Sequence, residues 1–343
     1  MAIVFFTAGL LIVAMVFFDA LWTTVWPEGG AGPITDRVAG TFWNAAKWVS
    51  HLRRDEEEGR DHRRLSASGP FVAIATVLVW FSAVYLGFFL MFSSTPSAVV
   101  DATTETTADF SDRVWYSLYV MSTLGNGDFK PDTALFQAVS GVASIGGISL
   151  LTLAITYVLQ VLEAVVHKRA FAYEVFSLGD TPEEIALTVA RAQSTGLTSH
   201  FGSMSTQLAT MTEQHKAFPI LHYFHPTDRR RSAVVAVAVL DEALLLSKAG
   251  ESDGKEGLLL SNIEPLRRIV GRFLESLQGD YFGRAAESPP TVSGFEAVRE
   301  INPEVSPARV QHLTDESTDR RRLLRALLHH NGWQWEDVSP GSG

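Results

Sequence analysis

The sequence predicts an all-α membrane protein followed by an α-helical domain. Residues 2–26, 70–92 and 135–166 are apolar, and each stretch is long enough to cross a hydrocarbon core of about 30 Å, which takes about 20 helical residues. A glycine-containing segment lies between the second and third stretches. The residues after 169 read as helices, and alternating strand patterns are scarce.

The composition supports a chain divided between membrane and water. Of 343 residues, 46% are hydrophobic and only 19% are charged, a balance that is high for a soluble chain and low for a fully embedded one. The chain has no cysteine, which excludes disulfides and thiolate metal sites. The formal charge of −10 argues against a nucleic-acid partner, because phosphate backbones are bound by excess Lys and Arg.

The distribution of Lys and Arg orients the predicted spans. Basic residues are frequent between the first two spans and at the end of the third, whereas the segment between the second and third has only Arg113 and Lys130 among several acids. The basic sides are therefore predicted to be cytoplasmic, with the N-terminus outside a multi-pass plasma-membrane protein. A cleaved signal peptide is the alternative for residues 2–26, but this stretch lacks a basic start and a small-residue cleavage site before Pro27.

Two features flank the first span. Asp19 is an acid inside the span, for which we expect a structural hydrogen bond with Thr23, Thr24 or a nearby Arg; proton sensing is the alternative. Within residues 27–69, apolar positions from Ile34 to Leu52 recur at helical spacing. They predict an amphipathic helix in the inner membrane interface, followed by a linker, or alternatively a helix packed on the soluble domain.

Residues 109–128 predict a short helix followed by a loop that enters the membrane without crossing it. Asp109 or Ser111 can cap the helix, which ends where a Thr-x-Gly-x-Gly-Asp segment begins at residue 123. Gly125 and Gly127 adopt left-handed conformations easily, so successive carbonyls can point the same way, as a dehydrated cation requires. By itself, a short glycine motif can also be a simple turn.

Residues 123–128 read Thr-Leu-Gly-Asn-Gly-Asp, which resembles the Thr-Val-Gly-Tyr-Gly-Asp filter of the potassium channel family. Trp115 and Tyr116 match the aromatic pair of that family's pore helix. Gly147, beside Gly146, matches the flexible glycine of its inner helix. The resemblance covers residues 1–169, in the layout of bacterial members with an extra N-terminal span, so residues 70–169 would be the pore domain and residues 170–343 a cytoplasmic helical domain.

The resemblance implies a role for each residue of the loop. The carbonyls of Thr123, Leu124, Gly125 and Asn126, with the Thr123 hydroxyl, would replace the hydration shell of K⁺, and Asp128 would brace the outer mouth. One such strand cannot surround an ion, and no internal repeat supplies another. The sequence therefore predicts a homotetramer in a lipid bilayer.

Asn126 departs from the family, which has Tyr at this position. Asn is smaller and carries hydrogen-bonding groups that need partners. We expect Tyr119 to fill the space behind the loop, and Asn126 to pair with the Tyr119 hydroxyl or the Trp115 indole. The alternative is a looser filter that also passes Na⁺ or Ca²⁺.

The third span carries candidates for pore lining and gating. One stripe at i, i+4 spacing contains Gly147, Leu151, Ile155, Leu159 and Glu163. Leu159 is the gate candidate, and Glu163 would form an acidic ring at the inner mouth. Gly146 and Gly147 would permit bending or close packing. In the alternative frame this stripe faces the outer helix, and Thr152 or Thr156 faces water.

Beyond residue 170 the sequence predicts a bundle of helices. They are expected at residues 182–196, 199–215, 228–248, 265–277 and 306–330, with a buried strand at 233–240 as an alternative and disorder after residue 335. No Gly-x-Gly-x-x-Gly or other nucleotide motif is present, so no ligand is assigned. His215, His222 and His225 have no acidic or thiolate companions at metal-site spacing, so no metal is expected there.

The function predicted from the sequence is passive K⁺ conduction, with no enzyme activity, no cofactor and no metal beyond the permeant ion. A weakly selective channel that also passes Na⁺ is the first alternative. A non-conducting receptor or enzyme is the second, and the lack of a nucleophile–base or ligand-binding constellation argues against it.

Overall fold

The computed structural model describes residues 1–26, 30–52, 62–192, 197–250, 258–278, 289–290, 294–303 and 305–340. They form two compact units. The first contains the described residues of 1–53 together with 70–161 and 217–220, and the second contains the described residues of 54–69, 162–216 and 221–343. The predicted domain boundaries stay a prediction.

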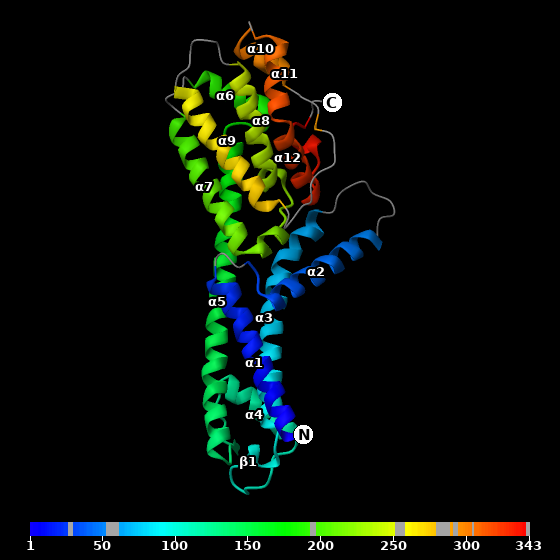
Figure 1. Ribbon diagram of the computed structural model, residues 1–343, viewed down its shortest axis with the longest axis vertical. Helices are drawn as coiled ribbons and strands as arrows, with labels where there is room; N and C mark the ends of the chain where they lie inside the picture. Colours follow the sequence, from blue (N-terminus) through cyan, green and yellow to red (C-terminus); the bar gives the residue numbers. More distant parts are fainter. Residues whose placement is uncertain are drawn as a thin grey trace. The chain divides into compact units, whose positions relative to one another are not determined.

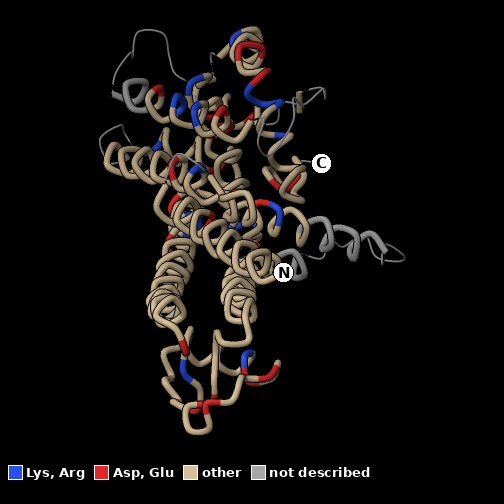
Figure 2. Tube along the Cα trace, turned by 60° about the horizontal axis from the view of Figure 1, so that its bottom comes forward, with Lys and Arg blue, Asp and Glu red and all other residues tan. Residues whose placement is uncertain are grey.

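Three long helices are apolar enough to cross a membrane: α1 Ala2–Val25, α3 His62–Phe92 and α5 Ala134–Phe176. They include the three predicted spans, and Figure 2 shows how sparse charges are along them. The chain is thus an all-α membrane protein, as predicted. The two-stranded sheet of β1 Val100–Asp101 and β2 Phe129–Lys130 was not predicted, because strands of two residues are too short for a pattern to show.

Helix α1 packs on α3 through two glycines (Figure 1). A Cβ built on Gly9 would lie 2.3 Å from the Gly87 carbonyl oxygen, and one built on Gly87 would lie 2.6 Å from a Val13 methyl group. Any larger side chain would push the helices apart. Small residues that bring backbones together are a usual means of joining helices in lipid, where hydrophobic burial between helices contributes little.

Asp19 ties α1 to the start of α2 Pro33–Leu52. Its carboxylate is fully buried and accepts hydrogen bonds from the Ile34 N–H at 2.6 Å, the Thr35 hydroxyl at 2.7 Å and the Trp80 indole at 2.9 Å. The structural role expected for Asp19 is confirmed, but the expected partners are wrong. Thr24 donates to the Ala20 carbonyl, and Thr23 instead accepts from the Gly32 N–H.

The reason lies in the ends of the two helices. The first turn of α2 has N–H groups without intrahelical acceptors, and a carboxylate satisfies them and offsets the positive end of the helix dipole. The presence of helix α2 confirms the helix that was predicted from the apolar positions between Ile34 and Leu52. The orientation of its side chains beyond Phe42 lies outside the described residues.

The second unit is a helical bundle around α8 Ala233–Gly250 (Figure 1). Every residue of α8 from 233 to 246 is buried, because α6, α9, α10, α11 and α12 pack around it. The surrounding helices are α6 Pro182–Arg191, α7 Thr198–Ala217, α9 Leu258–Leu277, α10 Phe295–Ile301, α11 Pro307–Glu316 and α12 Thr318–His330. A helix covered on all sides is apolar all round, and this pattern explains why the sequence also suggested a strand here; that alternative is wrong.

Several predicted boundaries in this unit are wrong. Helix α9 begins at Leu258 and carries Pro265 in its interior rather than at its start. The helix predicted over residues 306–330 is interrupted at Ser317, whose buried hydroxyl accepts a hydrogen bond from Arg267 at 3.0 Å. Helix α10 was not predicted, and the expected stop at Gly196 lies outside the described residues.

The chain after residue 335 is ordered up to residue 340, contrary to the prediction of disorder. A 3₁₀ turn, η4 Trp335–Asp337, is followed by Val338, which is 1% exposed. Arg229, in the 3₁₀ turn η3 Arg229–Arg231, donates to the Asp337 carbonyl at 2.9 Å. Tertiary contacts of this kind are invisible in a short polar sequence.

Candidate functional site

The short helix α4 Phe110–Met121 lies between α3 and α5 (Figure 1). It begins with a capping box, in which Asp109 accepts from the Asp112 N–H at 2.8 Å and Asp112 accepts from the Asp109 N–H at 2.9 Å. The cap predicted at Asp109 is confirmed. These bonds lower the pKa of the Asp109 carboxyl, the Asp112 N–H most of all, because they stabilise its ionised form.

Three side-chain hydrogen bonds hold α4 between its neighbours. Tyr85 of α3 donates to the Val114 carbonyl at 3.1 Å. On α5, Ser140 bonds the Tyr116 hydroxyl at 2.6 Å, and Ser144 donates to the Val120 carbonyl at 3.0 Å. Bonds to both neighbouring helices fix the orientation of α4. They therefore also fix the direction in which the loop leaves this helix.

Gly147 continues this contact one turn further along α5. A Cβ at this position would lie 1.9 Å from the Met121 carbonyl oxygen, so the backbones of α4 and α5 touch. Gly147 is buried here, whereas Leu151, Ile155 and Leu159 are exposed. Within one chain Gly147 therefore meets α4, and that it shares a pore-facing stripe with these three residues stays a prediction.

The backbone of the loop alternates in conformation. Thr123, Gly125 and Gly127 have φ of 59°, 61° and 83°, whereas Leu124 and Asn126 between them have negative φ. Alternation in the sign of φ turns successive peptide planes in opposite senses, so carbonyls that would otherwise alternate can face one side. This is the arrangement that a row of cation-coordinating oxygens requires.

Thr123 is strained in this arrangement. A β-branched residue rarely adopts positive φ, and such a conformation costs about 1–3 kcal/mol. Two hydrogen bonds from the loop to the end of α4 hold it in place: the Thr123 N–H donates to the Val120 carbonyl at 3.1 Å, and the Leu124 N–H donates to the Tyr119 carbonyl at 2.9 Å. Backbone strain that is fixed in this way is typical of functional sites.

The far end of the loop is anchored to the segment after α3. The Ala102 N–H donates to the Asp128 carbonyl at 2.8 Å, next to the pairing of β1 with β2. The Tyr119 hydroxyl donates to the Phe129 carbonyl at 2.7 Å. The loop is thus fixed at both ends, by α4 before it and by this small sheet after it.

Asn126 does not pair with the aromatic residues of α4, so the expectation for Asn126 is wrong. Its amide donates to the Asp128 carboxylate, two residues away. The hydroxyl of Tyr119 is engaged with Phe129 instead. A local partner two residues along the chain satisfies the short Asn side chain without the reach that a tyrosine ring has.

Three aromatic residues of α4, Trp115, Tyr116 and Tyr119, have different surroundings. Tyr119 is 3% exposed and packs edge to face against Tyr116, with ring centroids 5.2 Å apart, and against Trp115, at 5.8 Å. Tyr116 is directed to Ser140 on α5, and Trp115 is partly exposed. Tyr119 alone among them bonds the segment that continues the loop.

Residues 122–128 are all exposed in the single chain, and Leu124 has 63% of its surface free. One face of α5 is exposed as well, with Leu151 at 50%, Ile155 at 53% and Leu159 at 61%. Glu163, Thr152 and Thr156 are exposed too, so exposure within one chain does not distinguish the predicted frame from the alternative frame. That these residues line a pore stays a prediction.

Sequence reasoning missed Ser140, Ser144 and Phe129. The two serines lie four residues apart on an apolar helix, and small polar residues at that spacing are a usual signal of contact between membrane helices. Phe129 contributes through its backbone carbonyl, and a backbone role leaves no trace in the residue type.

In the second unit, Arg229 and the sequence-predicted candidate His225 have structural contacts. Arg229 donates to the Asp180 carbonyl at 2.7 Å and lies over the Phe176 ring, and the His225 ring stacks on Trp333. Within the described ranges no group of three or more His, Asp or Glu side chains is placed to hold a metal ion.

Comparison with known proteins adds the family context. Residues 73–164, from within α3 through α4 and the loop into α5, match a family described as ion channel. The chain is also similar to the uncharacterized membrane protein YdjJ of Bacillus subtilis (strain 168), with 33% identity over 330 residues. This alignment covers 96% of this chain and 94% of the relative. No solved structure matches the chain. The resemblance to a channel pore is confirmed by these matches.

Proposed function

The chain belongs to the ion channel family, and from that premise we propose that it conducts K⁺ passively through a pore formed by four copies. The observation that carries the proposal is the alternating sign of φ along residues 123–127, in a loop fixed at both ends. Such a loop presents a row of carbonyls from Thr123 to Asn126. Four rows around one axis provide the oxygens that replace the hydration shell of K⁺.

Conduction requires no bond chemistry in this proposal. A K⁺ ion enters because the carbonyls compensate its lost water, and it leaves because a second ion in a neighbouring site repels it. The Thr123 hydroxyl adds the innermost oxygen. Asp128 holds the outer end through its bonds to Asn126 and Ala102.

The homotetramer is supported by what the single chain leaves uncovered. Non-helical backbone at membrane depth is stable only when it is buried in protein or lines a water-filled cavity. Residues 122–128 are exposed in the chain alone, so neighbouring copies have to surround them. The exposed face of α5 faces the same axis in this arrangement, with Leu151, Ile155 and Leu159 along the inner pore and Leu159 as its constriction.

The orientation in the membrane is also proposed. Lys and Arg are concentrated in the segment between α1 and α3 and directly after residue 166. We infer that these parts are cytoplasmic, that the loop faces outside, and that the protein lies in the plasma membrane. Glu163 then places an acidic ring at the inner mouth.

One observation favours a second candidate, a weakly selective cation channel. Asn126 bonds Asp128 rather than the aromatic residues of α4, so its side chain does not brace the loop against Tyr119. A filter without that brace has a less strictly fixed diameter. Discrimination between K⁺ and Na⁺ depends on how firmly the carbonyls are held and on how many of them coordinate the ion.

The decisive experiment is recording from the purified protein in planar bilayers with K⁺ on one side and Na⁺ on the other. A K⁺-selective pore gives a reversal potential far from zero with the K⁺ side negative, because K⁺ leaves that side and Na⁺ does not replace it. A reversal potential near zero means equal permeability and favours the second candidate, whereas no current at any voltage, in protein shown to be tetrameric by native mass spectrometry, contradicts both.

A matched pair of glycine variants links the current to the loop. In Gly125→Ala the added Cβ is strained because φ is +61°, so we expect loss of current in a tetramer that still assembles. Gly141→Ala, in α5 with nothing within 4 Å of the added Cβ, is expected to conduct normally. Equal currents from the two variants would show that the loop is not the conduction path.

A further inference from the structure

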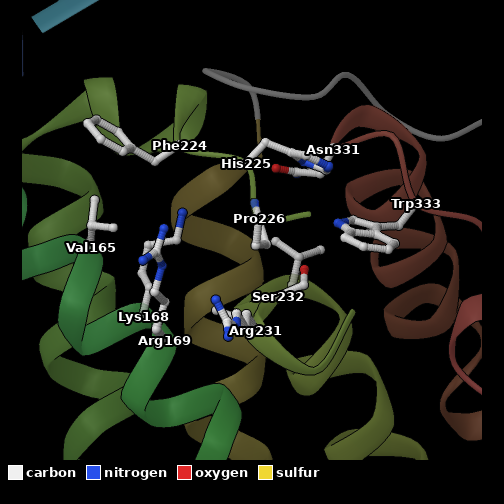
Figure 3. A pocket seen from close by; sticks show the side chains of 12 residues that line it. Val165, Lys168, Arg169, Phe224, His225, Pro226, Arg231, Ser232, Asn331 and Trp333 are labelled. Carbon is white, nitrogen blue, oxygen red and sulfur yellow. The ribbon is translucent and has the colours of Figure 1, made fainter. Parts of the chain in front are cut away.

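A cationic cavity lies in the second unit (Figure 3). It is lined by the end of the apolar part of α5, the segment 224–226, the start of α8 and the residues that follow α12. Its volume is about 370 Å³, including the part open to solvent. Much of this volume is open to solvent, so the enclosed part is small and suits a compact group rather than a large organic molecule.

Three cationic side chains line the cavity. Lys168 is 9% exposed, and its ammonium donates to the Leu221 carbonyl at 2.9 Å, which leaves two N–H groups for other acceptors. Arg169 and Arg231 are exposed, and neither side chain has a hydrogen bond or ion pair with any described residue. Figure 3 shows the three side chains on the same side of the cavity.

No Asp or Glu is among the described residues that line the cavity. This distinguishes Lys168 from two other buried cations of the unit. Arg267 and Arg321 are paired with Asp241 and Glu242. Burying an ammonium without a counter-ion is unfavourable, so the Lys168 environment is complete only when an anion occupies the cavity.

The start of α8 adds donors without charge. Ser232 is 2% exposed and its hydroxyl oxygen accepts from the Val235 N–H at 3.4 Å, so the hydroxyl hydrogen is available to another group. Ala233 and Val234 line the cavity at the first turn of this 18-residue helix. The N–H groups of a first turn lack intrahelical acceptors, and the positive end of the helix dipole favours an anion.

We propose that this cavity binds a phosphate group. Arg169 and Arg231 supply the forked donors that match phosphate oxygens, Lys168 supplies a buried positive charge, and Ser232 with the α8 N-terminus supplies neutral donors. The group has two possible sources, the head group of an anionic phospholipid or a soluble phosphate compound. Lys168 and Arg169 follow directly on the apolar stretch that ends at residue 166, so a lipid head group can reach them.

The test is calorimetric titration of the full-length protein in a neutral detergent. One arm uses inorganic phosphate, the second uses short-chain phosphatidylglycerol, and short-chain phosphatidylcholine is the lipid without net charge. The variant is Arg169→Gln with Arg231→Gln, chosen because both side chains are exposed and their removal leaves the packing intact. The control is Arg272→Gln, an exposed arginine on α9 with no partner among the described residues.

We expect saturable binding in at least one arm, weakened about tenfold or more in the double variant and unchanged in Arg272→Gln. Binding of phosphatidylglycerol without inorganic phosphate assigns the site to a lipid, and the reverse assigns it to a soluble compound. No binding in either arm, or equal weakening in the Arg272→Gln control, overturns the proposal. Thermal unfolding of the variants, unchanged from the parent, excludes loss of fold as the cause.

Discussion

Gly147 is the residue at which α5 meets the backbone of α4. We expect Gly147→Ala to destabilise the first unit by about 1–3 kcal/mol, the usual range for overpacking, because its Cβ would lie 1.9 Å from the Met121 carbonyl oxygen. A backbone atom cannot move aside as a flexible side chain can. The measurement is the midpoint of thermal unfolding in detergent, followed together with the current in bilayers.

The adjacent glycine is the matched control. A Cβ on Gly146 would meet Phe17 at 3.4 Å and Phe88 at 3.7 Å, which are ordinary van der Waals contacts with side chains. Because Ala is favoured over Gly in a helix by up to about 1 kcal/mol, Gly146→Ala is expected to be neutral or stabilising. Equal loss of stability in the two variants would mean that α5 and α4 are not in contact at Gly147.

His215 is a buried histidine of the second unit, 4% exposed, with its Nδ1 bonded to the Met211 carbonyl at 2.8 Å. Burial, with the positive charge of Lys168, lowers the pKa of His215 from 6.5 to about 3. Between these two values the unfolded chain takes up a proton that the folded chain does not. Stability is therefore full above about pH 6.5 and falls as the pH decreases toward 3.

We expect His215→Gln to flatten this dependence. The difference in unfolding temperature between pH 7 and pH 5 should be smaller in the variant than in the parent, as measured by thermal unfolding at both pH values. His312→Gln, at an exposed position, serves as the control and should keep the slope of the parent. An unchanged slope in His215→Gln would contradict the assignment.

At single residues, the sequence predicted types of chemistry better than pairings. The glycines of the loop were recognisable because positive φ demands them, and Asp109 was recognisable as a cap. The positive φ of Thr123 and the bond from Asn126 to Asp128 were not, because both depend on how the chain closes around them. Residue type limits the possible partners without choosing among them.

Helix α2 depends for its position on one carboxylate from another element. We expect Asp19→Asn to loosen the first turn of α2, since an amide replaces one accepting oxygen with a donor that faces the Thr35 hydroxyl and the Trp80 indole. Hydrogen bonds to a charged group contribute about 1.5–3 kcal/mol. Hydrogen exchange of the amides at residues 34–41 should become faster in the variant.

Asp36→Asn is the control for this change. Asp36 lies in the same first turn but is exposed, so its neutralisation removes only a weak interaction with the helix dipole. Protection of the amides at residues 34–41 from hydrogen exchange should then stay close to that of the parent. Unaltered exchange in Asp19→Asn as well would show that the carboxylate does not hold α2.

Among the elements, length and hydropathy predicted the three spans and α4 reliably, whereas boundaries in the second unit were less predictable. Pro265 is tolerated inside α9, and the interruption at Ser317 follows from its contact with Arg267, a residue 50 positions away in the chain. Helix α8 was ambiguous because complete burial removes the periodicity on which an assignment depends.

Over the whole molecule, the two units have separate cores, and the second is stabilised by a buried ion pair. Arg321 on α12 is 1% exposed and bonds both oxygens of Glu242 on α8, at 2.7 and 3.0 Å. We expect Glu242→Gln to destabilise the second unit by about 3–5 kcal/mol, because it leaves the guanidinium buried without its counter-ion. Thermal unfolding should then show a separate, earlier transition.

The exposed pair of Arg322 and Asp319, at 3.5 Å, provides the comparison. Exposed ion pairs contribute about 0–1 kcal/mol, so Arg322→Gln should leave the unfolding curve nearly unchanged. If Glu242→Gln also left it unchanged, or shifted all of the unfolding together, the view of two units with separate cores would fail.

The proposed assembly of several chains rests on the same argument in sequence and structure. The single loop per chain, with no internal repeat, led us to propose other copies, and the exposed loop and α5 face are where these copies would pack. The proposed phosphate site of the second unit could not be predicted from the sequence. The cavity brings together residues from four separate segments, and none of these residues is unusual when taken singly.

The touching backbones at Gly147 and Met121 have a mechanical consequence. With no slack between them, α5 cannot tilt or rotate about this point without displacing Met121, which lies two positions before Thr123. A pull on the inner end of α5 would then displace the strained Thr123. The two ends of the proposed permeation path could therefore not be adjusted independently.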